Sequence, residues 1–90
     1  MQKNYLYLKD FAAVINAEYK PGDKIGVASS ASSNATNLPF YTQKKIDFMP
    51  DISTYLQQKS RVFLIIPEDQ LQDGARVLQR KAGWLLVSNR

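Results

Sequence analysis

Residues 62–66 are continuously apolar and mostly β-branched, and they constrain the fold more than any other part of the chain. The run is far too short to span a bilayer, which needs roughly 20 residues, so it belongs in a protein core. Side chains alternate between the two faces of a strand, so a strand with no polar position must be covered on both faces. The run therefore predicts a central strand in a sheet that lies between layers of helix.

Four helical segments are predicted from apolar spacing and from the residues that begin and end helices. The first runs from residue 8 with one apolar face and ends at residues 21–22, a Pro-Gly pair. A short helix follows a cap at residues 32–34, and a third begins after Asp51, a residue type favoured at the N-cap. The last covers residues 68–81, where acidic residues at the start and basic residues at the end suit the helix dipole.

Strands are predicted at residues 24–28, 45–49, 61–67 and 84–88. The alternation of polar and apolar residues over 45–49 favours an edge position. Helices separate all the strands, which predicts mainly parallel pairing with right-handed crossovers. We therefore expect residues 1–90 to form a single α/β domain, Rossmann-like, with a four-stranded, mainly parallel sheet in the order 2-1-3-4 between helices.

Composition excludes several kinds of chemistry. The chain has no cysteine and no histidine, which excludes disulfides, thiolate metal sites, cysteine nucleophiles and any catalysis that needs an imidazole. A pair of carboxylates could act as acid and base, but helix capping accounts for most of the acidic residues that might form one. We predict no catalytic residue, no metal site and no cofactor, so the isolated domain is expected to be inactive.

The charge balance favours an anionic partner only weakly. Twelve Lys and Arg against eight Asp and Glu give a net charge of +4. These cations are scattered, with adjacent pairs only at Lys44-Lys45 and Arg80-Lys81, and a dense basic stripe interleaved with aromatic residues is absent. We therefore expect no nucleic-acid partner.

The polar segment after the first strand is a candidate binding loop. In open α/β sheets, ligands bind beyond the carboxyl ends of the strands, where Ser30, Ser32 and Asn34 are expected. Their hydroxyl and amide groups could hold a phosphate, although the glycines and lysine of a phosphate loop are missing. A solvated loop that caps a short helix is the alternative interpretation.

Four segments together resemble a known family. They are the first helix, the Tyr-Lys-Pro-Gly-Asp turn at residues 19–23 with the strand after it, the Leu-Pro-Phe-Tyr-Thr-Gln-Lys-Lys-Ile segment at 38–46, and the strand at 61–66. In this order they are similar to the C-terminal extracytoplasmic domain of membrane glycosyltransferases related to protein mannosyltransferases and aminoarabinose transferases. That family usually has a segment resembling Phe-Tyr-Thr-Gly-Arg, and Gln43 stands where its glycine would be.

The resemblance implies an accessory part of a larger membrane protein. Such enzymes transfer a sugar from a polyprenyl-phosphate carrier to a lipid, glycan or protein, and their catalytic acids lie in the membrane-embedded portion. Implied partners are that portion of the same polypeptide and lipid headgroups or the acceptor, at the periplasmic or outer face of the cytoplasmic membrane. Tyr41 and Lys44 join Ser30, Ser32 and Asn34 as expected binding residues. The competing hypothesis is a free-standing cytoplasmic binding or regulatory module with a Rossmann-like or flavodoxin-like sheet.

Overall fold

The computed structural model describes residues 6–28, 42–48, 51–81 and 83–90. Its elements, in chain order, are α1 (Leu6–Glu18), β1 (Lys24–Val27), β2 (Asp47–Phe48), α4 (Ile52–Leu56), β3 (Val62–Pro67), the 3-10 turn η2 (Glu68–Gln70), β4 (Arg76–Lys81) and β5 (Trp84–Ser88). The short helix predicted after residues 32–34 lies outside the described residues.

The strands form one five-stranded mixed sheet in the order β2-β1-β3-β5-β4. β1 pairs in parallel with β2 and with β3, whereas β5 is antiparallel to both β3 and β4. The α/β class is confirmed, as are the edge position of β2 and the contact between β3 and the last strand. The predicted four-stranded, mainly parallel sheet is wrong, because a fifth strand is present and half of the pairings are antiparallel.

The additional strand replaces the helix predicted over residues 68–81. Only the turn η2 is helical in this stretch, and β4 instead pairs with β5 along its length, with a bulge between Val77 and Gln79. Gly74 (φ 88°) and Gly83 (φ 84°) adopt left-handed backbone conformations on either side of β4. Gly74 interrupts the predicted helix, and pairing with β5 outweighs the helical preference of the residues between the two glycines.

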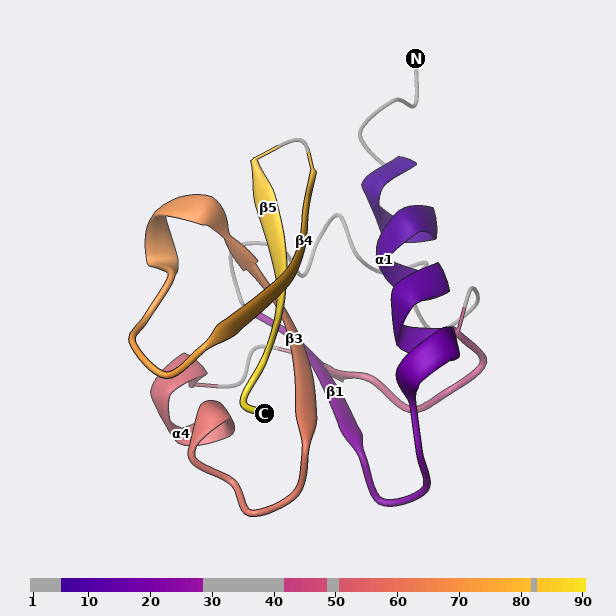
Figure 1. Cartoon of the computed structure of the whole chain (residues 1–90), viewed down its shortest axis with the longest axis horizontal. Coiled ribbons are helices and arrows are strands. Elements are labelled where there is room, and N and C mark those ends of the chain that lie inside the picture. The colour runs from indigo at the N-terminus through magenta and orange to yellow at the C-terminus, as the bar shows by residue number, and fades with distance from the viewer. Residues whose placement is uncertain (1–5, 29–41, 49–50, 82) are drawn as a thin grey trace.

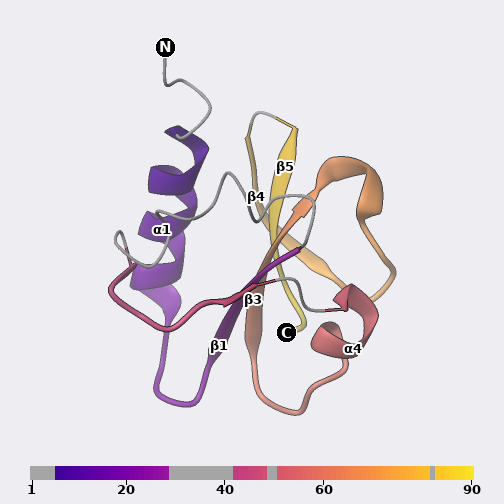
Figure 2. The same cartoon turned by 180° about the vertical axis from the view of Figure 1, so that it is seen from behind.

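Both faces of the sheet are covered, as the apolar run predicted. Along β3, Phe63 and Ile65 pack into a core beneath α1, while Val62, Leu64 and Ile66 pack into a second core that includes Tyr55 of α4. All of these β3 side chains are fully buried. Figures 1 and 2 show α1 and α4 on opposite sides of the central strands. Each large apolar side chain buried in this way contributes roughly 1.5 to 3 kcal/mol.

The expected helix ends are present in α1 and α4. Asp51 is the N-cap of α4, and its carboxylate accepts hydrogen bonds from the Thr54 backbone N–H (3.2 Å) and the Thr54 hydroxyl (2.6 Å). These two bonds lower the pKa of Asp51 below its ordinary value. After α1, Gly22 (φ 96°) turns the chain directly into β1.

Gly26 sits in the middle of β1 for a steric reason. A Cβ atom at this position would lie 2.8 Å from Cε2 and 2.9 Å from Cζ of Tyr55. The ring of Tyr55 therefore packs directly on the backbone of β1, and only glycine leaves the room that it needs.

The molecule is compact, with a radius of gyration of 11.7 Å, close to the value of about 12 Å expected for a folded chain of this length. Among the helices that the structure describes, none has the length and apolar character needed to cross a membrane.

Candidate functional site

The structure describes one of the five predicted binding residues. Ser30, Ser32, Asn34 and Tyr41 lie outside the described residues, and Lys44 is the one that the structure describes. In the chain, β1 ends at Val27, shortly before residues 29–41, which lie outside the described residues, so the expected ligand position stays a prediction.

Lys44 is tied to the helix α1. Its ammonium lies 4.9 Å from the centre of the Tyr19 ring and donates to the Asn16 side-chain oxygen at 3.5 Å. It also donates to the Thr42 carbonyl at 3.3 Å. These contacts hold the segment that leads into β2 against the end of α1. Lys44 therefore has a structural role in addition to any role in binding.

The neighbouring residue Gln43 has a left-handed backbone. Its φ is 56°, the one positive value among the non-glycine residues that the structure describes. On either side, Thr42 and Ile46 are buried, with 3% and 8% of their surface exposed. An exposed residue between two buried ones therefore has a backbone conformation that glycine adopts most easily.

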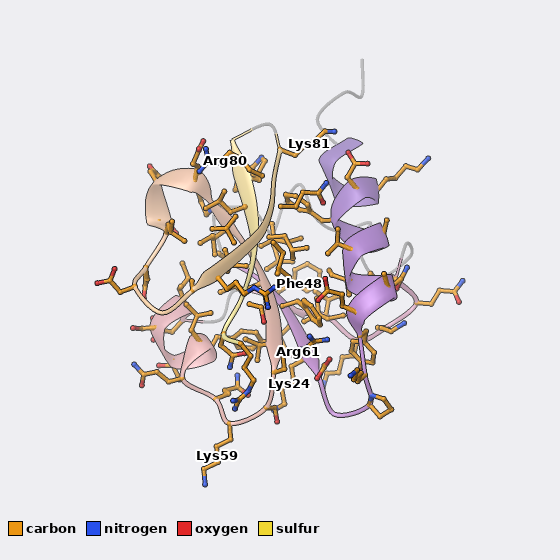
Figure 3. The ribbon with its side chains drawn as sticks, viewed as in Figure 1. Lys24, Phe48, Lys59, Arg61, Arg80 and Lys81 are labelled. Carbon is orange, nitrogen blue, oxygen red and sulfur yellow. The ribbon has the colours of Figure 1, made fainter. Side chains whose placement is uncertain are left out.

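An ionic cluster joins the end of α1 to the turn before β1 and to the start of β3. Arg61 Nη2 lies 3.1 Å from Asp23 Oδ2 and also donates to the Glu18 carbonyl at the end of α1, and the Lys20 backbone N–H donates to Asp23 at 2.9 Å. The guanidinium also stacks over the Phe63 ring at 4.7 Å. Figure 3 shows Arg61 at this end of the sheet, near Lys24. A cation at the carbonyl end of a helix is favourable, so the cluster stabilises the joint.

Asp47 and Tyr55 form a second polar contact that the sequence did not reveal. The Tyr55 hydroxyl donates to Asp47 Oδ2 at 2.9 Å, which links α4 to the edge strand β2. Burial raises the pKa of Tyr55 above its ordinary value, and the hydrogen bond to Asp47 and its negative charge raise it further. The phenol therefore stays protonated at neutral pH, where it can donate a hydrogen bond but cannot serve as a base.

Two of the three charged side chains of β4 are used in surface ion pairs. Arg80 Nε lies 3.0 Å from Glu68 and Lys81 Nζ lies 2.8 Å from Asp10 of α1. Figure 3 shows both residues at the same end of the hairpin. Within the described residues, no group of three or more acidic side chains is arranged to hold a metal ion. The described geometry thus offers polar contacts for binding but no assembled acid, base and nucleophile.

Comparisons of the chain with protein-family models, with curated proteins and with solved structures found no match. The function must therefore be argued from the residues and their geometry.

Proposed function

We propose that the chain is an accessory domain of a membrane glycosyltransferase that uses polyprenyl-phosphate sugars, and that it is not catalytic by itself. The observation that carries the proposal is the left-handed conformation of Gln43 (φ 56°). This position corresponds to the glycine of the Phe-Tyr-Thr-Gly-Arg-like segment. A backbone that favours glycine is therefore found at the one position where this sequence departs most visibly from the pattern.

The contacts among the four resembling segments also support the proposal. Lys44 joins the third segment to Tyr19 in the turn, and Arg61, which directly precedes β3, binds Asp23 of the same turn. The first helix packs on β1 and β3 in one core. Residues that form a pattern in the sequence thus form one connected unit in space, as expected for a shared fold.

The partners and location follow from the same proposal. The domain would face the periplasm or the outer side of the cytoplasmic membrane and pack on the membrane-embedded portion of its own polypeptide. The strands β2, β1 and β3 pair in parallel, and in the sequence β1 is followed by the segment that contains Ser30, Ser32, Asn34 and Tyr41. We place the contact with lipid headgroups or with the glycan or lipid acceptor there.

The first test is an immunoblot of fractionated source cells with an antibody against this domain. We expect a band several-fold heavier than the 10.2 kDa of the chain, in the membrane fraction, that detergent releases but high salt does not. Protease added outside the cytoplasmic membrane should remove the epitope. A band near 10.2 kDa in the cytoplasmic fraction would contradict the proposal and leave the free-standing binding module.

The second test is sugar transfer by the full-length product. Alanine at Ser30, Ser32, Asn34 and Tyr41 should lower transfer from a polyprenyl-phosphate donor while the protein stays in the membrane at normal levels. The matched control is Lys59→Ala, because Figure 3 shows Lys59 pointing away from the body of the domain on the loop between α4 and β3. Equal transfer by the two sets of variants would refute a role for the strand-end segment.

A further inference from the structure

A small pocket lies at the opposite end of the parallel strands from the predicted ligand position. β1 pairs with β3 from Lys24 onward, but its pairing with β2 begins only at Gly26 and Asp47. The residues that lead into β2 therefore run beside the start of β1 without pairing as a strand. The pocket there has a volume of about 280 Å³ and is lined by Tyr19, Asp23, Lys24, Ile25, Lys45 and Asp47.

The two lysines of this pocket are neighbours. Gly26 and Asp47 are register partners in parallel strands, and Lys24 and Lys45 each precede them by two residues. Both lysines line the same pocket, and the strands beside it are about 4.8 Å apart where they pair. Both ammonium groups can therefore reach one ligand in the pocket.

The acidic side chains of the pocket have partners within the protein, whereas its two lysines form no ion pair within the described residues. Asp23 is held by Arg61 at 3.1 Å, and Asp47 accepts the Tyr55 hydroxyl at 2.9 Å. Lys24 and Lys45 are exposed, and within the described residues neither forms an ion pair. The carboxylates thus have partners inside the protein, while the two cations face an open volume.

We propose that this pocket binds a phosphate group through Lys24 and Lys45. The volume is just below the range of about 300 to 1,000 Å³ in which drug-sized ligands bind, so it suits a single small anionic group. Lysine binds phosphate as a point charge with rotatable donors, and two of them side by side neutralise a phosphate that one would hold only weakly. The inference does not depend on the proposed transferase function.

The test is a titration of the ¹⁵N-labelled chain with inorganic phosphate at constant ionic strength, followed by amide chemical shifts. We expect shifts confined to residues 24–25 and 45–47 and a Kd on the order of 1 to 10 mM. Lys24→Gln and Lys45→Gln should each weaken binding by about fivefold, the upper limit for an exposed ion pair. Asp47→Asn keeps an oxygen that can accept from Tyr55 but removes a negative charge, so it should tighten binding.

Lys59→Gln is the matched control, because it removes the same charge from an exposed loop away from the pocket. If it weakens binding as much as Lys24→Gln, or if phosphate causes no shifts at residues 24–25 and 45–47, the pocket is not a phosphate site. The amide spectrum of each variant shows directly whether it has folded.

Vesicles distinguish the two sources of a phosphate group. Binding to phosphatidylglycerol vesicles that free phosphate and Lys24→Gln both reduce would assign the group to a lipid headgroup. Phosphate binding without vesicle binding would assign it to a soluble phosphate ester. Either result supports the pocket, and the absence of both kinds of binding overturns it.

Discussion

Replacing Gly26 by alanine should destabilise the domain through one contact, the ring of Tyr55. The new Cβ would lie 2.8 and 2.9 Å from two ring carbons and 3.2 Å from Leu64 Cδ1. The ring cannot swing away freely, because Tyr55 is 5% exposed and its hydroxyl is bound to Asp47 at 2.9 Å. Overpacking of this kind costs about 1 to 3 kcal/mol.

A smaller gain opposes this cost. Alanine restricts the unfolded chain more than glycine does, which stabilises a compatible site by about 0.4 to 1 kcal/mol. The φ of Gly26 is not positive, so the backbone itself accepts alanine without strain. From the middle of each range, the net loss should be about 1.3 kcal/mol, or a fall in Tm of roughly 5 to 10 °C for a domain of this size.

The assay is urea unfolding followed by the fluorescence of Trp84, the single tryptophan of the chain. Gly26→Ala is compared in the native background and in Tyr55→Leu, which lacks both of the clashing ring atoms. In the Tyr55→Leu background the substitution should be neutral or slightly stabilising. The clash with the ring is absent there, so the restriction of the unfolded chain by alanine is the main remaining effect. Equal destabilisation in both backgrounds would refute the role of the Tyr55 ring, and no destabilisation in the first would refute the clash itself.

Three further substitutions test other contacts. Asn89→Ala should lower the free energy of unfolding in urea by about 1 to 3 kcal/mol. The Asn89 side chain accepts a hydrogen bond from the Val62 N–H and donates to the Gln58 and Ser60 carbonyls, each at 3.0 Å. Gln57→Ala, at an exposed position, is the control. Gln43→Gly should raise stability by up to about 1 kcal/mol by relieving the left-handed backbone, whereas Gln57→Gly, at a φ of −89°, should lower it. The raised pKa of Tyr55 means that its neutral form is favoured in the folded state. Its contribution to the free energy of unfolding is therefore complete below about pH 10 and is lost as pH rises further. Urea midpoints should therefore fall less steeply above pH 10 in Tyr55→Phe than in the native chain, and parallel curves would contradict the assignment.

The elements that were predicted correctly are those whose sequence pattern fits only one kind of secondary structure. A fully apolar strand must be covered on both faces, and Asp51 before an apolar helical face is a strong N-cap, so both predictions are confirmed. The stretch 68–81 has two interpretations. Leu71, Ala75 and Leu78 fit a helical stripe, yet Leu71 is 45% exposed, and the other two pack against opposite cores of the sheet. Only the availability of β5 as a pairing partner decides between helix and strand.

Contacts between segments that are far apart in the chain could not be predicted, for a different reason. A glycine inside a strand packs no side chain, and nothing nearby in the chain shows that the Tyr55 ring packs on Gly26. Asp47 and Tyr55 each had a sufficient local explanation, as a polar position of an edge strand and as part of a helical face. Their hydrogen bond depends on how α4 docks on the sheet, which local patterns do not encode.

Lys44 and Lys45 are adjacent and identical in type, and the structure predicts opposite behaviour for them. Lys44 contacts the Tyr19 ring at 4.9 Å and Asn16 at 3.5 Å, so Lys44→Ala should cost about 0.5 to 1 kcal/mol of stability, as for an exposed cation–π contact. Lys45 is exposed and lines the pocket, so Lys45→Ala should change stability by less than about 0.5 kcal/mol while weakening phosphate binding. Urea unfolding and the phosphate titration on the same two variants separate these effects. If Lys44→Ala weakens phosphate binding more than Lys45→Ala at unchanged stability, the assignment of structural and binding roles within this pair is reversed.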